Sequence, residues 1–246
     1  MDFSFSIINV ILINVLLIIL YKYLESFWSD TLAKPYKWEQ AIKSRTISKT
    51  LKISEKKYYD KVRFYSIWFQ MDRIIREEVK GDFAELGVHK GETAKLIFET
   101  APNRNFHLFD TFEGFNENDL ELENKKGGMY SSKQFSDTNL ETVKKYIGQS
   151  NHLIFHPGYF PYTTKGLEDV KFSFVHLDAD LYLPTIEGLK FFYPRLSPRG
   201  VIIVHDYNHI WDGVKKALDE FMPTVPECLI ELPDWKGSVM IVKNKK

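Results

Sequence analysis

The chain has 246 residues, of which 44% are hydrophobic and 15% aromatic, enough to bury the core of one large α/β domain. Its 33 basic and 33 acidic side chains give a formal charge of zero, which argues against a nucleic-acid partner. The single cysteine, Cys228, excludes an internal disulfide and is expected to be a buried, unreactive thiol.

Residues 3–21 form an uncharged segment rich in Ile, Leu and Val, long enough to span a bilayer as a helix. We therefore expect residues 1–22 to be a membrane anchor. Lys22 follows the segment and Lys34 lies further on, which favours a catalytic domain in the cytoplasm. The alternative is a soluble cytoplasmic protein whose N-terminal helix packs on the domain or in a dimer seam, so a homo-oligomer is compatible with the sequence.

Residues 23–64 have few helix breakers and are expected to be a helical lead-in to a catalytic domain over 65–246. A helix with apolar residues at helical spacing is predicted from Phe64 to Val79. From Gly81 onward, strand and helix patterns alternate. The expected strands are 83–86, 106–110, 153–156, 172–178 and 200–206, and the expected helices are 92–100, 184–193 and 211–221.

Two further strands, 229–232 and 238–243, are joined by Pro-Asp-Trp-Lys-Gly and predict a β-hairpin. The alternation of strands and helices predicts a doubly wound, mostly parallel α/β sheet with an antiparallel last strand. The stretch 116–137, rich in Asn, Glu, Gly and Ser, interrupts the pattern. It is expected to be a flap over the site or an idle surface loop.

The first predicted strand ends in an acid and is followed by two glycines at the start of a helix. Glycines let a ligand approach the backbone, and the helix amino terminus offers free N–H groups. Glu85 disfavours a pyrophosphate and favours a cationic or amino-acid-bearing nucleoside, while Asp110, at the end of the second strand, is placed to reach ribose hydroxyls. An adenosyl ligand is indicated, with the expected binding residues Glu85, Gly87, Val88, Gly91, Thr93, Asp110 and Thr111.

Two later strands also run into acidic residues, Asp178 and Asp180 after one and His205-Asp206 after the other. Because the carboxyl ends of parallel strands meet at one edge, these side chains are expected to converge. Oxygen ligands with one nitrogen suit Mg²⁺ or Mn²⁺, and a remaining group could handle a proton. This pattern indicates an enzyme. His176, inside the apolar strand, is expected to be a core histidine.

Six blocks occur in order along the chain: 81–91 (GDFAELGVHKG), 109–114 (FDTFEG), 158–163 (GYFPYT), 177–182 (LDADLY), 200–207 (GVIIVHDY) and 211–221 (WDGVKKALDEF). Together they resemble the macrocin O-methyltransferase (TylF/MycF-type) family, S-adenosylmethionine-dependent enzymes that methylate sugar hydroxyls on natural products. The resemblance spans about residues 65–246. It implies a seven-stranded Rossmann-like methyltransferase sheet with S-adenosylmethionine held at the Glu85 and Asp110 strand ends.

The resemblance also implies Mg²⁺ held by Asp178, His205 and Asp206. Where the family usually has two aspartates, His205 replaces one, which would admit Mn²⁺ or another nitrogen-tolerant metal. In the family's layout the second acid of Asp-x-Asp is the base, which carries over to Asp180. The alternative for Asp180 is to cap the following helix.

The expected function is therefore S-adenosylmethionine-dependent methyl transfer to a hydroxyl of a sugar, a glycan or another small molecule, assisted by a divalent metal. Two alternatives come from other classes. Asp178-Ala-Asp180 also resembles the metal motif of nucleotide-sugar glycosyltransferases. An inert, membrane-attached binding protein is the third reading, with His205 marking decay of the site.

Overall fold

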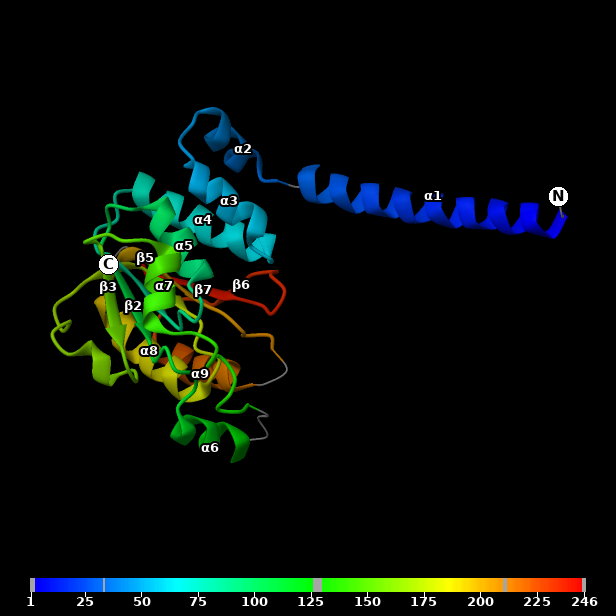
Figure 1. The fold of residues 1–246 in the computed structure, drawn as a ribbon. Helices are drawn as coiled ribbons and strands as arrows, with labels where there is room; N and C mark the ends of the chain where they lie inside the picture. The colour runs from blue at the N-terminus through cyan, green and yellow to red at the C-terminus, as the bar shows by residue number, and fades with distance from the viewer. Residues whose placement is uncertain (1–2, 33, 126–129, 210–211, 245–246) are drawn as a thin grey trace. The chain divides into compact units, whose positions relative to one another are not determined.

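A computed structural model describes residues 3–32, 34–125, 130–209 and 212–244 of the chain (Figure 1). Contacts divide it into two compact units, Met1–Ile47 and Ser48–Lys246, which are described separately below. Trp211, the expected first residue of the helix 211–221, and positions 126–129 of the expected flap lie outside the described residues.

The first unit contains helices α1 (Phe3–Leu32) and α2 (Tyr36–Lys43). Within α1, the span Ser6–Phe27 is long and apolar enough to cross a membrane, a property that signal sequences share, and its most apolar window is fully exposed. The helix continues beyond residue 22, the expected end of the anchor.

The second unit begins with helices α3 (Lys49–Lys57) and α4 (Lys61–Arg76). Ser48 caps α3 by accepting a hydrogen bond from the Leu51 N–H at 2.9 Å. Asp60 caps α4 in the same way, accepting from the Arg63 N–H at 3.0 Å. Because of this cap, α4 begins before Phe64, the expected start.

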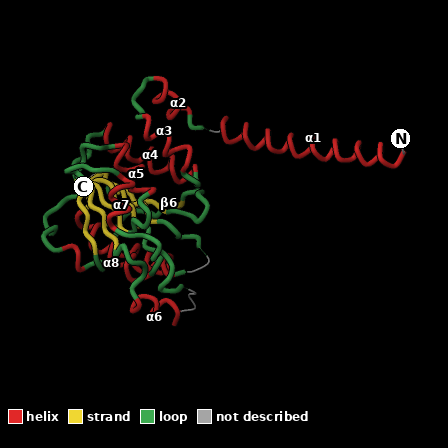
Figure 2. The backbone as a smooth tube through the Cα atoms, viewed as in Figure 1, coloured by secondary structure: helices red, strands yellow, loops and turns green. Residues whose placement is uncertain are grey.

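The second unit is built on a seven-stranded sheet with the order β3-β2-β1-β4-β5-β7-β6. Figure 2 shows its strands in yellow, between helices in red. The first five strands pair in parallel, and β7 runs antiparallel to both β5 and β6. The predicted doubly wound, seven-stranded α/β sheet with an antiparallel last strand and preceding helices is thus confirmed. The strands are β1 (Asp82–Leu86), β2 (Phe106–Asp110), β3 (Leu153–Pro157), β4 (Phe172–Leu177), β5 (Leu196–Val204), β6 (Ile230–Glu231) and β7 (Val239–Val242).

Helices cover both faces of the sheet (Figure 1). One face carries α4, α5 (Glu92–Thr100) and α7 (Leu140–Ile147), and the other carries α8 (Tyr182–Arg195) and α9 (Gly213–Phe221). Every residue of the central strand β4 is buried, as expected for a parallel strand covered on both sides. Short elements complete the unit: α6 (Glu117–Lys125), η1 (Tyr162–Thr164) and η2 (Met222–Thr224).

Two expectations were wrong in detail. Part of the expected loop 116–137 is the helix α6, and one of its acids, Glu123, accepts a hydrogen bond from the Tyr182 N–H at the start of α8. Cys228 is exposed rather than buried, because it precedes the short edge strand β6 instead of opening it.

The register of the sheet brings the site residues to one edge. Leu86 is paired with Leu177, and Leu177 with Val204, so the residues that follow them lie side by side. The Asp178 N–H donates to the Leu86 carbonyl at 2.8 Å, and the His205 N–H donates to the Leu177 carbonyl at 2.9 Å. The chain reverses its winding between β1 and β4, and open α/β sheets bind ligands at such a switch point.

Candidate active site

The turn after β1 requires glycine at two positions. Gly87 has a φ of +88°, and a Cβ on it would lie 1.9 Å from the Asp178 carbonyl oxygen. Gly91 has a φ of +82° and is the N-cap of α5. An L side chain at either position would be strained, so the backbone here takes a path that other residues rarely adopt.

Asp110 organises this turn. Its Oδ2 accepts hydrogen bonds from the N–H groups of Val88 at 2.7 Å and His89 at 2.9 Å. Its Oδ1 accepts from the Phe112 N–H at 2.6 Å. A carboxylate offers about four acceptor directions, so Asp110 can hold the loop and still receive a ligand hydroxyl.

Glu85 and His176 form a buried pair at the ends of β1 and β4, with side-chain exposures of 1% and 0%. His176 Nδ1 lies 3.0 Å from Glu85 Oε1, while Glu85 Oε2 has no hydrogen-bond partner among the described residues. Burial, and then the charge of Asp178, raises the pKa of Glu85 well above its usual range. Burial likewise lowers the pKa of His176 to about 3, so burial disfavours the charged form of both groups. The site thus disfavours the negative charge that was expected at Glu85.

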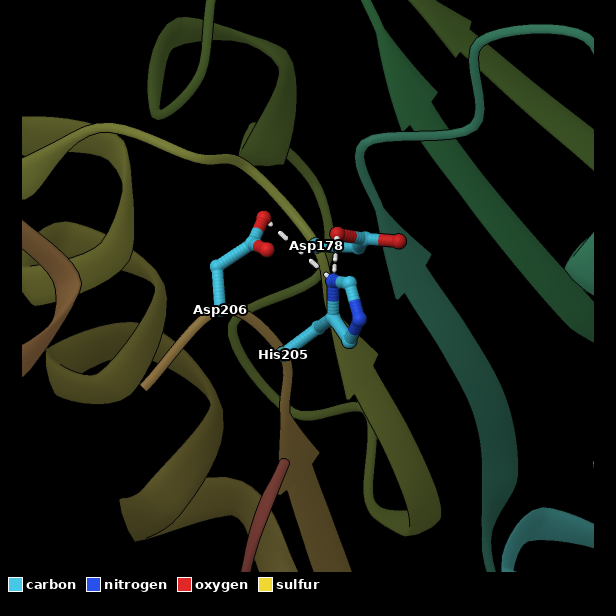
Figure 3. Close-up of side chains that lie close together, drawn as sticks. All are labelled: Asp178, His205 and Asp206. Carbon is cyan, nitrogen blue, oxygen red and sulfur yellow. Dashed lines mark hydrogen bonds and ion pairs between the residues drawn. The ribbon is translucent and has the colours of Figure 1, made fainter. Parts of the chain in front are cut away.

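Three of the predicted residues form a compact cluster of possible metal ligands (Figure 3). Asp178, His205 and Asp206 each offer one ligand atom, all within 4.8 Å of one another. His205 Nδ1 lies 2.9 Å from Asp178 Oδ1 and 3.3 Å from Asp206 Oδ2. Both Asp206 carboxylate oxygens are buried and, within the described part of the chain, have only ion-pair contacts with His205 and Lys236 and no well-formed hydrogen bond. Two carboxylates and an imidazole fit a divalent cation.

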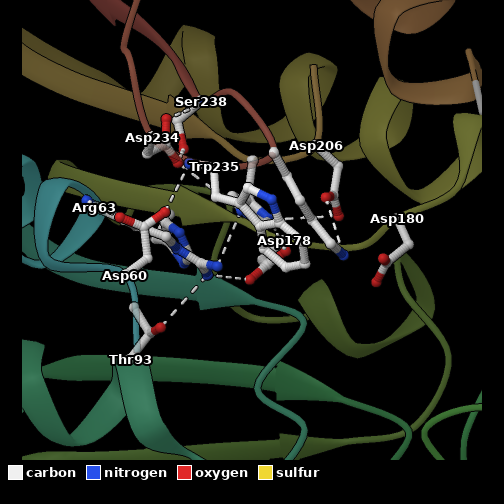
Figure 4. Close-up of polar contacts among 12 residues, drawn as sticks. Asp60, Arg63, Thr93, Asp178, Asp180, Asp206, Asp234, Trp235 and Ser238 are labelled. Carbon is white, nitrogen blue, oxygen red and sulfur yellow. Dashed lines mark hydrogen bonds and ion pairs between the residues drawn. The ribbon is translucent and has the colours of Figure 1, made fainter. Parts of the chain in front are cut away.

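Asp180 and Asp206 both adopt left-handed backbone conformations, with φ of +59° and +63°. Non-glycine residues rarely do so outside functional sites and tight turns. Asp180 does not cap α8, whose N-cap is Leu181, without a side-chain cap hydrogen bond. Its carboxyl group lies beside Asp206 (Figure 4). Burial, followed by the charges of Asp206 and Asp178, raises the pKa of Asp180 well above its usual range.

Sequence analysis missed two cations that flank the cluster, Arg63 (Figure 4) and Lys236. Arg63, on the first turn of α4, forms an ion pair with Asp178, and its Nη1 lies 3.0 Å from His205 Nε2. Lys236, between β6 and β7, places its Nζ 3.3 Å from Asp206 Oδ1. The neighbouring Trp235 N–H donates to Asp60 at 2.7 Å. No local sequence pattern signals either cation, because each reaches the cluster from a distant segment.

The contacts of His205 act on its protonation in opposite directions. Burial disfavours a charged ring, but the Asp178 carboxylate outweighs burial and raises the pKa of His205 to about 9. The Arg63 contact opposes a second proton, because a guanidinium can only donate and Nε2 must then accept. The Asp178 contact thus favours a proton on Nδ1, whereas the Arg63 contact favours an unprotonated Nε2.

A cavity of about 510 Å³ joins the glycine turn to the acidic cluster. It is within the usual range for a small-molecule or cofactor site. Its lining includes all but one of the predicted site residues: Glu85, Gly87, Val88, Thr93, Asp110, Thr111, Asp178, Asp180, His205 and Asp206. Gly91 lies outside the lining. Thr93 and Thr111 already have partners, since Thr93 Oγ1 pairs with the Tyr58 hydroxyl and Thr111 Oγ1 donates to the Gly114 carbonyl.

Residues 60–227, more than half of the chain, match the macrocin O-methyltransferase (TylF) family. One relative is the 8-demethyl-8-(2,3-dimethoxy-alpha-L-rhamnosyl)-tetracenomycin-C 4'-O-methyltransferase of Streptomyces olivaceus, 28% identical over 59% of this chain and 60% of the relative. Another is the mycinamicin III 3''-O-methyltransferase of Micromonospora griseorubida, 27% identical over 56% and 59%. The chain spans about three fifths of the length of these relatives.

Among solved structures, the O-methyltransferase NovP is similar with a TM-score of 0.62 and 23% sequence identity. The match covers 75% of this chain and 80% of NovP. This likeness supports the fold described above.

Proposed function

Because the chain belongs to the macrocin O-methyltransferase family, we propose that it is an S-adenosylmethionine-dependent O-methyltransferase that acts on a sugar hydroxyl. The observation that carries the proposal is that a glycine turn closed by Asp110 and the acids Asp178, Asp180 and Asp206 line one shared cavity. One end of this cavity suits a nucleoside, and the other suits deprotonation of a hydroxyl.

The cofactor would lie along the turn after β1. The proposed contacts are Glu85, Gly87, Val88, Gly91, Thr93, Asp110 and Thr111. The fit rests on the Oε2 of buried Glu85, which has no partner among the residues that the structure describes, and on the acceptor capacity that Asp110 retains. Because burial disfavours the charged form of Glu85, hydrogen bonding is its proposed mode of cofactor recognition.

The acceptor would enter beside the acidic cluster. Sugar hydroxyls are proposed because the two relatives described above are named for methylating a rhamnosyl group and mycinamicin III. The balanced formal charge gives no reason to expect a nucleic acid.

Asp180 is the proposed base, because its carboxyl group lines the cavity beside the cluster and does not cap α8. It would accept the proton of the attacking hydroxyl. Asp178, His205 and Asp206 are the proposed ligands of a divalent cation, Mg²⁺ or Mn²⁺. When bound, such an ion would lower the pKa of the acceptor hydroxyl and fix its orientation.

The exposed apolar span Ser6–Phe27 supports a further proposal, that residues 1–22 begin a membrane anchor and hold the enzyme at a bilayer with its catalytic domain in the cytoplasm. In this arrangement 23–64 link the anchor to the domain over 65–246. A soluble cytoplasmic enzyme is the alternative.

Binding and turnover test the proposal together. Calorimetry with S-adenosylhomocysteine and with a uridine diphosphate sugar separates a methyltransferase from a glycosyltransferase, since the proposal expects binding of the first only. Radiolabelled methyl transfer from S-adenosylmethionine to a panel of deoxysugar glycosides then separates an enzyme from an inert binding protein. Binding of the uridine diphosphate sugar without binding of S-adenosylhomocysteine would refute the proposal.

A further inference from the structure

Arg63 makes contacts that oppose a cation at the acidic cluster. Its guanidinium forms an ion pair with Asp178 and touches His205, two of the three proposed metal ligands. Its side chain is only 15% exposed, so water screens this charge weakly. A metal ion would therefore face a fixed positive charge on the ligands that it needs.

The same contact also favours the tautomer of His205 that cannot bind a metal through Nδ1. The two carboxylates of the cluster lie around Nδ1, so Nδ1 is the nitrogen that faces a shared ion. Ligation requires a lone pair there, which places the proton of a neutral ring on Nε2. Nε2–H would then face the Arg63 Nη1–H, and two donors repel each other.

Arg63 is not fully bound in this position. Its buried Nε has no hydrogen-bond partner among the described residues, and its bond from Nη2 to Thr93 Oγ1 is long, at 3.5 Å. A guanidinium with five donors is thus held mainly by Asp178 and His205, the groups that a metal would take from it. Its removal from the cluster would break few other contacts.

We infer that Arg63 is a built-in competitor of the divalent cation, so that metal binding requires Arg63 to leave Asp178 and His205. The inference rests on the proposed metal ligands and adds to them a residue that sets metal affinity. Arg63 is a positioning residue here: it acts on the ligands.

Mn²⁺ affinity of the full-length protein, measured by the paramagnetic resonance of free Mn²⁺, tests the inference without an acceptor. Arg63→Gln removes the charge and should bind Mn²⁺ at least about tenfold more tightly than the wild type. Arg63→Lys keeps the charge and should remain within about threefold. Arg73→Gln is the matched control on the same helix, because Arg73 contacts Gln70 and the Arg199 carbonyl instead. It should not change the affinity.

Unchanged or weaker Mn²⁺ binding by Arg63→Gln overturns the inference. The inference is also overturned if neither the wild type nor Arg63→Gln binds Mn²⁺. Circular dichroism checks the fold of each variant. A measurement on the wild type remains if the variants do not fold: saturating Mg²⁺ should shift the side-chain NMR signal of Arg63, and an unmoved signal overturns the inference. Calorimetry with S-adenosylhomocysteine on the same samples tests the proposed function separately.

Discussion

The carbonyl oxygen of Asp178 occupies the space that a side chain on Gly87 would need. A Cβ at Gly87 would lie 1.9 Å from this oxygen, far inside any normal contact. The cofactor turn after β1 and the acidic cluster after β4 are therefore packed directly against each other.

Gly87→Ala should destabilise the protein by more than about 2 kcal/mol, since it adds a clash with the backbone to an unfavourable φ. Gly166→Ala is a matched control, because Gly166 has a similar φ of +86° with nothing near its Cβ position. The control should lose only about 1 kcal/mol from the backbone conformation. Urea unfolding measures both, and equal losses would contradict the packing argument.

Replacement by Asn should have different effects at Asp178 and at Asp180, on metal binding at the first and on methyl transfer at the second. Asp178→Asn removes a proposed ligand, so it should weaken Mn²⁺ binding and activity together, with partial rescue by excess metal. Asp180→Asn should keep metal and cofactor binding but lose about 10²-fold or more in single-turnover methyl transfer. Asn tolerates the left-handed backbone at residue 180, so the change tests the carboxylate alone. Equal loss of metal binding in both variants would make Asp180 a ligand.

Asp110→Ala should weaken S-adenosylhomocysteine binding by at least about 1.5 kcal/mol, the value of hydrogen bonds to a charged group. Because Asp110 also holds the Val88 and Phe112 N–H groups, this variant should also unfold more easily. Asp110→Asn retains one acceptor oxygen, so it should lose less cofactor affinity and less stability than Asp110→Ala. The exposed Asp169→Asn is the control for charge alone. Calorimetry that gives wild-type affinity in Asp110→Ala would refute the ribose assignment.

The stability of the domain should fall in mild acid because of His156 on β3. Its ring stacks on Phe109 with centroids 4.4 Å apart, and burial, then the nearby His107, lowers its pKa to about 4. In the unfolded chain this imidazole binds a proton near pH 6.5, whereas in the folded protein it does so only near pH 4. The stability that depends on the neutral His156 ring is therefore fully present above about pH 6.5 and is lost as the pH falls toward about 4. Unfolding free energies measured across this range should show a smaller slope in His156→Gln. An unchanged slope would assign the acid sensitivity to other groups.

Deletion of residues 1–22 should release the protein from membranes while S-adenosylhomocysteine binding persists, because a spanning helix adds little to a separate core. Fractionation of the full-length and the shortened protein measures release from membranes, and calorimetry measures whether S-adenosylhomocysteine binding persists. If the full-length protein is found entirely in the soluble fraction, the proposed membrane anchor is refuted.

The sheet could be predicted from sequence because most of its strands are apolar runs bounded by glycine, proline or polar residues. Residues 106–110 and 92–100 have the predicted bounds. Helix α6 could not be predicted, since its polar sequence is fixed by distant contacts: Leu120 packs with Tyr130 and Leu181. The convergence of Asp178, His205 and Asp206 follows from the parallel register.

The charge state of the site lay beyond the sequence. The pairing of Glu85 with His176 depends on burial that only the assembled sheet creates. Arg63 is 115 residues from Asp178 along the chain, and nothing near it in sequence differs from an ordinary surface helix. Periodicity identifies which face of α4 is apolar but not where a long cationic side chain ends.

Asp60 has a consequence that extends beyond starting a helix. One of its carboxylate oxygens holds the backbone of Arg63, and the other holds the turn that carries Lys236, through the Trp235 N–H. The segments that carry the two cations, Arg63 and Lys236, are thus both hydrogen-bonded to the side chain of Asp60. Replacement of Asp60 would therefore disturb the positions of both cations at once, through two segments that are far apart in the sequence.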